Sequence, residues 1–286
     1  MLILQNPLRA AIQLSLILCI GFSSQAQSPA VLKSQFKLEY VGKVLTARNF
    51  CEANKLVYAA NGELEGKCRP GPWTVYGKFY ITQIDIERNK LKISGERVMV
   101  GPDPASSRGL VLFRTRDPIY VEVQLSTPPT LETGRKAFYQ AFLNPKEDVA
   151  DFVPDYWKVY LRPTLEPVNP PAGPGSLVPT AAPVSRDAAS VVFKAESGVI
   201  QGRARKQTRP TYPEVAKAYR QAGTVILKGT INTEGRIESL VIAKPAGFGL
   251  DEAAIEAVRQ WEYVPYILKG EPVSVETHIT VNFVLP

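Results

Sequence analysis

Short stretches in which apolar and polar residues alternate dominate residues 31–161. Residues 118–125 show the pattern most clearly. One face carries Ile119, Val121, Val123 and Leu125, and the other carries Tyr120, Glu122 and Gln124. A period of two predicts a β-strand that is buried on one side only.

Two further strands are expected at residues 73–87 and 91–100, which are rich in aromatic and β-branched residues and are separated by the polar turn at residues 88–90. Residues 132–143 form the one stretch in this half with clear helical character, and residues 155–161 close it. We therefore expect a mostly-β domain over residues 31–161.

From Thr208 onward the pattern predicts a compact α+β module of order α-β-β-α-β with a small antiparallel sheet. A helix starts at Tyr212-Pro213 and ends before Gly223, because proline suits the first turn and glycine the position after the last. We expect Val215, Ala216 and Tyr219 on its packed side. Strands at 224–231 and 236–245 flank the turn at 232–235 and predict a hairpin.

A second helix of the module begins near Gly249. One of its faces is apolar at helical spacing, formed by Leu250, Ala254, Ala257, Val258 and Trp261. Asp251 and Glu252 lie in its first turn, where the helix dipole favours carboxylates and where Asp251 can cap the helix end. Glu256 points away from the apolar face, so we interpret all three acids as structural.

Residues 272–286 alternate along their whole length and predict the last strand. Val273, Val275, Thr277, Ile279, Val281, Phe283 and Leu285 share one face, and Ser274, Glu276, His278, Thr280 and Asn282 share the other. His278 is the single histidine of the chain. We interpret it as a surface residue of the strand.

Between the two predicted domains the composition changes to a proline-rich stretch at residues 162–187 without periodicity. Such a stretch favours extended polyproline II and acts as a semi-rigid linker. The basic residues Arg203, Arg205, Lys206 and Arg209 follow in a segment at 188–207 and just beyond it. No aromatic platform accompanies these charges, so we interpret 188–207 as a solvated lead-in and expect no nucleic-acid partner.

The N-terminus is typical of an export signal. Arg9 precedes the apolar run 10–22, which is shorter than the ~20 residues that a spanning helix needs. Ser24 and Ala26 match a cleavage site, so residues 1–26 are a signal peptide, with a retained membrane anchor as the alternative. After export Cys51 and Cys68 remain, and an oxidising compartment favours a disulfide between them.

Composition and motifs give no support for catalysis. The net charge of +7 and the charged fraction of 21% are ordinary for a soluble domain. The sequence has no nucleophile elbow, no metal-ligand spacing and no glycine-rich phosphate loop. We therefore expect a protein that is not an enzyme and uses no metal or cofactor.

The C-terminal residues resemble the TonB C-terminal domain over residues 208–286. The resemblance rests on positions that recur in order along the segment: Tyr212-Pro213, Gly223-x-Val225, Glu234-Gly235, Leu250-Asp251-x-Ala253-Ala254, Trp261, Pro265, Gly270-x-Pro272-Val273 and Val281-x-Phe283. It implies an energy transducer whose terminal domain crosses the periplasm and binds a short peptide, the TonB box, of an outer-membrane receptor.

The resemblance also implies where the peptide binds. The box adds as an extra strand beside the last strand, around residues 276–284, by β-augmentation. The residues expected to contact it are Arg209, Tyr212, Glu276, His278, Thr280 and Asn282. Arg209 departs from the family, which commonly has glutamine there.

Two functions stay open from the sequence. The first is a TonB-like transducer, anchored at the inner membrane, where it contacts motor proteins. The second is a soluble periplasmic interaction module without energy transduction, which binds envelope peptides or forms a homodimer. The apolar run 10–22 is shorter than the family's transmembrane helix and has no histidine, and its cleavage or retention separates the two functions.

Overall fold

The computed structural model describes residues 28–103, 105, 109–125, 130–162, 193–194 and 204–285. The expected signal or anchor at 1–26 lies outside these residues, as do all of the linker except Arg162 and most of the segment 188–207. None of the helices in the described ranges is long and apolar enough to cross a membrane. Below, residues 28–162 are the N-terminal region and residues 204–285 the C-terminal region.

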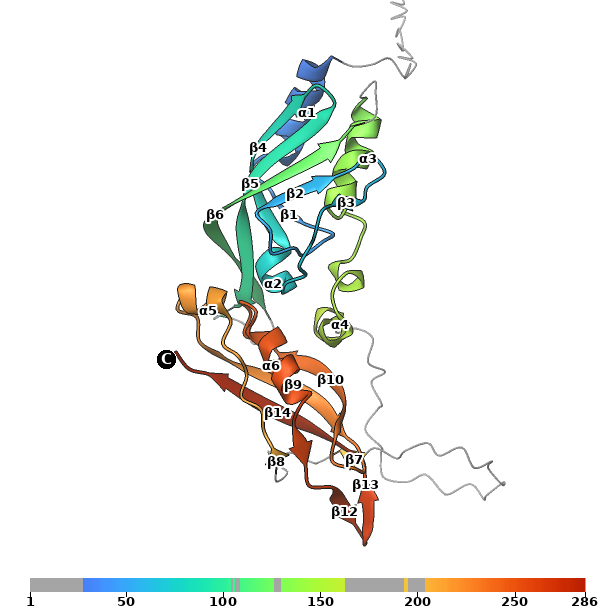
Figure 1. The fold of residues 1–286 in the computed structure, drawn as a ribbon, viewed down its shortest axis with the longest axis vertical. Coiled ribbons are helices and arrows are strands. Elements are labelled where there is room, and N and C mark those ends of the chain that lie inside the picture. Colours follow the sequence, from blue (N-terminus) through green and yellow to red (C-terminus); the bar gives the residue numbers. More distant parts are fainter. Residues whose placement is uncertain are drawn as a thin grey trace, which may run out of the picture.

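The N-terminal region is built on a six-stranded sheet of order β1-β4-β5-β6-β2-β3 (Figure 1). Successive strands β4, β5 and β6 pair antiparallel, whereas β2 joins β6 in parallel. The strands are β1 (Val44–Thr46), β2 (Lys55–Tyr58), β3 (Leu64–Glu65), β4 (Lys78–Glu87), β5 (Lys90–Pro102) and β6 (Leu110–Gln124).

Helices accompany this sheet, and they are more numerous than the sequence pattern predicts. They are α1 (Pro29–Tyr40), α2 (Trp73–Tyr76), α3 (Leu131–Ala141) and α4 (Asp155–Leu161), with a 3-10 turn at Val149–Asp151. Only α3 was expected. The N-terminal region is therefore an α+β structure, and the expectation of a mostly-β domain with one helix is wrong.

The physical reason is visible at each unexpected helix. Helix α1 buries Leu32, Phe36 and Tyr40, which recur every four residues, and Ser28 caps its start. Helix α2 starts after Pro72, in a stretch whose aromatic and β-branched residues also suit a strand. Helix α4 buries only Trp157, so its sequence shows no apolar stripe.

In the same region the alternation predicted at residues 118–125 is confirmed, whereas the strand expected at 73–87 begins only at Lys78, because residues 73–76 form α2. Ile119, Val121, Val123 and Leu125 are buried, while Tyr120 is exposed. The turn at residues 88–90 joins β4 to β5, and Arg88 adopts the left-handed conformation that a tight turn requires. Cys51 and Cys68 form a disulfide, as the sequence predicts.

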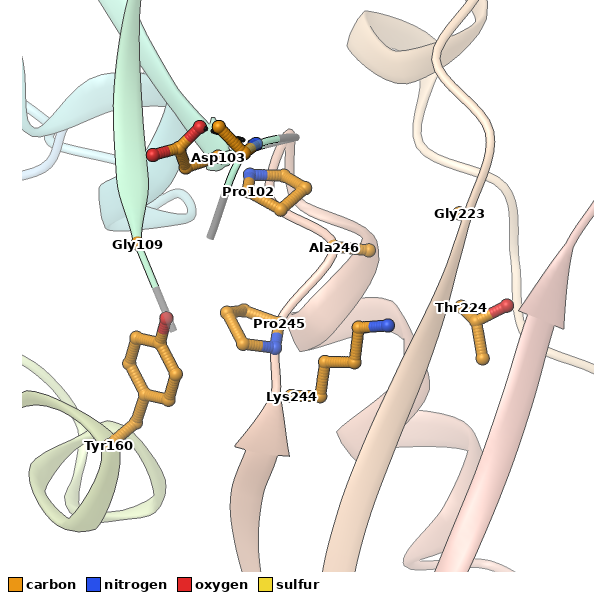
Figure 2. A pocket seen from close by; sticks show the side chains of 10 residues that line it. Pro102, Asp103, Gly109, Tyr160, Gly223, Thr224, Lys244, Pro245 and Ala246 are labelled. Atoms are coloured by element: carbon orange, nitrogen blue, oxygen red, sulfur yellow. Dashed lines mark hydrogen bonds between the residues drawn. The ribbon is translucent and has the colours of Figure 1, made fainter. Parts of the chain in front are cut away.

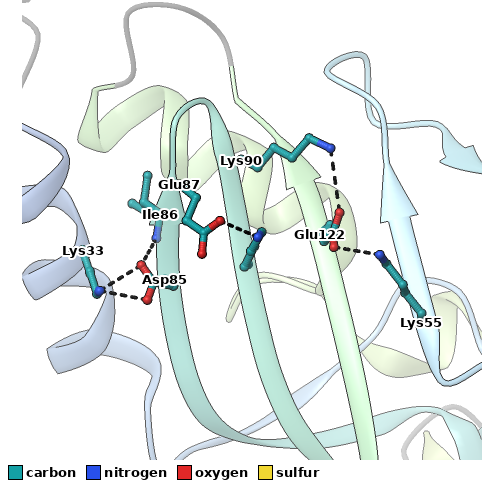
Figure 3. A network of polar contacts seen from close by, with 8 residues as sticks. Lys33, Lys55, Asp85, Ile86, Glu87, Lys90 and Glu122 are labelled. Atoms are coloured by element: carbon teal, nitrogen blue, oxygen red, sulfur yellow. Dashed lines mark hydrogen bonds and ion pairs between the residues drawn. The ribbon is translucent and has the colours of Figure 1, made fainter.

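Ion pairs link neighbouring strands and α1 at the end of the N-terminal sheet that contains the β4–β5 turn (Figure 3). Lys33 of α1 lies 2.8 Å from Asp85 of β4. Glu122 of β6 lies 2.8 Å from Lys55 of β2 and 3.9 Å from Lys90 of β5. These contacts are partly exposed, so we expect each to add little to stability.

The C-terminal region contains a second sheet of order β10-β9-β14-β7, in which the first three strands are antiparallel. Two small strand pairs, β8 with β11 and β12 with β13, lie beside it. The strands are β7 (Phe193–Lys194), β8 (Ala204–Lys206), β9 (Gly223–Ile231), β10 (Ile237–Lys244), β11 (Glu262–Tyr263), β12 (Tyr266–Leu268), β13 (Glu271–Val273) and β14 (Val275–Phe283).

Helix α6 (Leu250–Val258) packs against β9 and β10, and helix α5 (Glu214–Ala218) precedes β9. The predicted order α-β-β-α-β is therefore present, and the apolar face of α6 is buried as expected. Helix α5 is shorter than predicted and leaves Tyr219 exposed rather than packed. The single strand expected at 272–286 is divided at Ser274 into β13 and β14.

The lead-in to the C-terminal region also differs from its prediction. Arg205 and Lys206 belong to β8, which pairs antiparallel with β11. This part of the basic segment therefore has a paired backbone, although the side chains of Arg205 and Lys206 are exposed to solvent. Within the C-terminal region, strand pairing begins at Ala204, whereas the resemblance to the TonB C-terminal domain begins at Thr208.

The two regions share one hydrophobic core at their junction, where the β5–β6 hairpin and α4 meet α6 and β10 (Figure 1). The N-terminal region contributes Trp73, Val75, Met99, Val100, Val153 and Trp157. The C-terminal region contributes the apolar faces of β9, β14 and α6 together with Phe248. We call this junction the seam.

Candidate functional site

Strand β14 has one fully paired side and one that is largely open. All nine of its residues, Val275–Phe283, pair with β9. On the other side, among the described residues, only Val275 and Glu276 have a partner, the parallel strand β7. Over the part of the chain that the structure describes, the outer edge of residues 277–283 pairs with no strand. We call this stretch the open edge.

The polar face of β14 carries four of the predicted contact residues in one row. His278, Thr280 and Asn282 are exposed, and Glu276 is partly exposed. Glu276 lies 3.3 Å from Lys228 of β9, and Asn282 accepts a hydrogen bond of 2.8 Å from the Thr224 hydroxyl. The opposite face of the strand is buried in the core.

Tyr212 lies close to the end of the open edge. Its ring packs edge-on against Phe283, with 5.6 Å between ring centroids, and its hydroxyl donates to the Gln221 carbonyl. Arg209 is exposed three residues earlier, next to Thr208, whose carbonyl accepts a 2.8 Å hydrogen bond from Trp261 Nε1. The structure thus places Tyr212 in contact with Phe283 of β14. The residue before Arg209, Thr208, is instead hydrogen-bonded to Trp261.

The acids of α6 do not face water as a group. Asp251 is fully buried and accepts hydrogen bonds from the backbone amides of Ala246 and Gly247, at 2.8 and 2.7 Å. It does not cap the helix, whose N-cap is Gly249. Burial and the neighbouring Glu252 raise the pKa of Asp251 well above its ordinary value.

Glu252 also has a structural role, across the seam. Its Oε1 accepts a 2.9 Å hydrogen bond from Trp157 Nε1, and its Oε2 is buried without a hydrogen-bond partner. Burial raises the pKa of the Glu252 carboxyl, and the Trp157 hydrogen bond offsets this only in part. Glu256 is exposed, as the sequence predicts.

A cleft of about 430 Å³ lies where the two regions meet (Figure 2). Its walls come from the ends of β5 and β6, from Tyr160 of α4 and from residues 244–246 after β10. Lys244 points across it toward Thr224, and the Tyr160 hydroxyl points toward Gly109. Within the described ranges, no three His, Cys, Asp or Glu side chains are grouped so that they could hold a metal ion.

Sequence reasoning missed the residues of the seam. Phe248 is buried between two glycines, and Trp157 reaches Glu252 from a helix that was not predicted. The signal for Phe248 was present as Gly247-Phe248-Gly249, an apolar residue framed by glycines directly before a helix. Nothing in the sequence indicated which surface Phe248 meets.

Comparison with known proteins identifies the C-terminal region. Residues 208–285 match the family model described as the Gram-negative bacterial TonB protein C-terminal. Residues 208–285 form a TonB C-terminal domain. The predicted resemblance over these residues is confirmed, and the open edge belongs to the last strand of this domain.

Two relatives give the extent of the similarity to the TonB C-terminal domain. Protein TonB of Vibrio cholerae is 34% identical over 80 residues, which are 28% of this chain and 33% of that protein. The match therefore spans about a third of the curated relative. The solution structure of the Pseudomonas aeruginosa TonB C-terminal domain is 22% identical and covers 34% of this chain and 96% of its own, with a TM-score of 0.26.

Proposed function

We propose that this chain is a TonB-like cell-envelope protein that binds the N-terminal peptide of an outer-membrane receptor and couples inner-membrane energy to transport. The peptide adds as a strand along the open edge of β14. The observation that carries this proposal is the asymmetry of β14, which within the described ranges is paired along its whole inner side and at only two residues of its outer side.

Strand addition requires free backbone groups and room for side chains beside them. An unpaired strand edge presents a row of N–H and C=O groups that a guest backbone can pair with. Because successive side chains of a guest strand point to opposite faces, every second one lies beside His278, Thr280 and Asn282. These polar residues then set selectivity, and the ring of Tyr212 limits the end of the site near Phe283.

Strand β7 supports the proposal, because it already pairs with the outer side of β14 as a short added strand. Phe193 and Lys194 pair with Val275 and Glu276 in the parallel direction. The guest peptide occupies the remaining residues, 277–283, or extends over the first two by displacing β7. Residues 1–26 in this proposal deliver the chain to the periplasm or anchor it at the inner membrane next to motor proteins, and residues 162–187 serve as the spacer.

Cysteine cross-linking tests the proposed edge. Single cysteines replace His278, Thr280 and Asn282 in turn, and each variant is mixed with receptor N-terminal peptides that carry one cysteine at successive positions. We expect disulfides with alternate peptide positions, because paired strands place alternate side chains on one face.

The matched control is Glu238→Cys, which lies on β10 at the opposite side of the sheet. We expect no cross-link there. Equal cross-linking of the Glu238→Cys variant and of the three β14 variants would contradict strand addition at the open edge. A peptide that fails to bind full-length protein at all would favour the second function, an interaction module with another partner.

A further inference from the structure

The backbone before α6 has an unusual conformation. Gly247, Phe248 and Gly249 have φ angles of 74°, 53° and 80°, so three consecutive residues are left-handed. Left-handed backbone is unfavourable for a residue with a side chain such as Phe248, and it persists only where surrounding contacts hold it. We call residues 247–249 the seam loop.

Contacts of the seam loop lie mainly in the N-terminal region. The Phe248 amide donates to the Val100 carbonyl and the Gly249 amide to the Thr74 hydroxyl, both at 3.3 Å. The Phe248 ring is 4% exposed and lies 5.1 Å from the ring of Phe113, between centroids. The N-terminal region thus contacts the seam loop through a backbone carbonyl, a hydroxyl group and an aromatic ring.

The fit of the seam loop is close enough to exclude a side chain at its first position. A Cβ atom on Gly247 would lie 2.4 Å from the Val100 carbonyl oxygen and 2.6 Å from Gly101 Cα. A Cβ atom on Gly101 would in turn lie 2.6 Å from the Phe248 ring. Backbone therefore meets backbone at this point, as in a protein interior.

Two more contacts extend the seam on either side of the loop. Trp157 donates to Glu252, and Trp157 itself packs edge-on against Trp73 at 5.2 Å between centroids. On the far side the Tyr219 hydroxyl donates to Asp117 at 2.9 Å. The seam combines apolar burial, close backbone contact and directed hydrogen bonds, so its geometry is specific.

We propose that the seam is a latch: the N-terminal region holds the C-terminal region through residues 247–252, and release of this contact separates the two regions while the chain still joins them. Opening the latch extends the reach of the open edge without unfolding either region. The use of that reach, to meet a distant peptide, rests on the proposed function, whereas the latch itself does not.

The change in reach follows from chain length. Residues 163–203 connect Arg162 to Ala204. At ~3.4 Å per extended residue they span at most about 140 Å, or about 100 Å while β7 stays paired with β14. While the latch is closed, the contacts of the seam fix the distance between the two regions.

Pulling on the full chain from tags before Ser28 and after Pro286 tests the latch. We expect a discrete lengthening of at most about 140 Å, the limit derived from chain length above, before any unfolding step, with reclosure when the force is lowered. Phe248→Ala should open at clearly lower force while the later unfolding steps stay the same. Leu112→Ala, an exposed apolar residue beside Phe113, is the control and should behave like the wild type.

Cleavage between the two regions provides an unloaded measurement. A protease site is inserted after Gly175, and the cut protein is analysed by size-exclusion chromatography. We expect the wild-type halves to remain associated, and Phe248→Ala and Trp157→Phe to weaken the association at least tenfold. Near-ultraviolet circular dichroism shows whether the halves of each variant stay folded.

Two results would overturn the latch. One is smooth extension of the wild type from the lowest force, together with separation of its halves after cleavage. The other is unchanged opening and unchanged association in both Phe248→Ala and Trp157→Phe. Neither measurement involves a receptor peptide, so failure of the latch and failure of peptide binding are distinguishable.

Discussion

Replacing Gly247 by a residue with a side chain is unfavourable for two reasons. Its φ of 74° is unfavourable for any L-residue with a side chain, and an added Cβ would meet the Val100 carbonyl oxygen at 2.4 Å. Gly270 offers a matched comparison, because its φ is 89° and no atom lies within 4 Å of its would-be Cβ.

Gly247→Ala and Gly270→Ala therefore separate backbone strain from steric conflict. We expect Gly270→Ala to lower the free energy of unfolding by about 1–2 kcal/mol, the cost of left-handed backbone alone. Gly247→Ala should lower it by about 3–5 kcal/mol, since relief of the contact requires the seam to shift. Urea unfolding of the two variants measures both, and equal losses would show that the seam is not closely packed.

Glu252 makes stability depend on pH. Burial raises its pKa in the folded protein above the ordinary value of 4.5. The folded state therefore holds the proton more tightly, and this stabilising contribution is complete below the pKa of the unfolded chain and is lost as the pH rises through the folded pKa.

Glu252→Gln removes this dependence while keeping an acceptor for Trp157. We expect the variant to be more stable than the wild type at pH 8, by about 1–2 kcal/mol, and no more stable at pH 4. Asp251→Asn is the contrast. It puts an amide NH₂ against one of two backbone donors, so we expect a loss of about 2–3 kcal/mol at both pH values. Denaturant titrations at the two pH values test both variants.

At the scale of elements, the disulfide ties together the loop before α2. Cys51 is buried in the N-terminal core, and Cys68 precedes the short segment that leads to Trp73 and Thr74 at the seam. Arg97 is buried beside this loop and donates hydrogen bonds to the carbonyls of Cys51 and Ala53.

Replacing both cysteines by serine should lower the free energy of unfolding by about 3 kcal/mol, the chain-entropy value for a loop of this size. Thermal unfolding of oxidised wild type and the double variant measures the loss. Because the Arg97 hydrogen bonds hold the loop independently of the bridge, we expect the variant to stay folded at 25 °C. A variant that is unfolded under those conditions would contradict this role of Arg97.

Most elements with a regular apolar period were predicted from the sequence, although α1, whose buried residues recur every four positions, was missed. Residues 119–124 of β6 and the apolar face of α6 follow their periods of 2 and 3.6 closely, because each packs one face on a core. Helix α4 buries Trp157 alone, and α2 follows the turn at Pro72, so neither has a stripe to detect. The division of the last strand at Ser274 depends on β12, a partner that alternation does not reveal.

The residues of the candidate site were likewise predictable from the sequence only in part. Alternation placed Glu276, His278, Thr280 and Asn282 on one face of β14, and the resemblance pointed to the edge of that strand. Asp251 is buried against the backbone amides of Ala246 and Gly247, and Glu252 accepts a hydrogen bond from Trp157 of the N-terminal region. Such contacts between distant segments leave no periodic signal, so the sequence suggested only a dipole and capping role for Asp251 and Glu252.

For the molecule as a whole, the shared core predicts cooperative unfolding. Trp73, Val100 and Trp157 belong to the same buried cluster as Leu250, Val258 and Phe248. Opening the seam exposes these side chains to water, at ~25 cal/mol per Å² of apolar area, so neither region loses its fold without weakening the other.

We therefore expect a single calorimetric transition for the wild type, with equal calorimetric and van't Hoff enthalpies. Phe248→Ala should separate it into two transitions, because the residue removed fills the contact between the regions. Leu112→Ala should retain one. Two transitions in the wild type would show that the regions unfold independently despite the seam.

The position of His278 has a practical consequence. It is the only histidine in the chain, it is exposed, and it stands in the middle of β14. Its imidazole proton resonances are therefore a natural single-site reporter: a ligand that settles on this strand shifts one isolated signal, and occupancy can be titrated by NMR on unlabelled, unmutated protein.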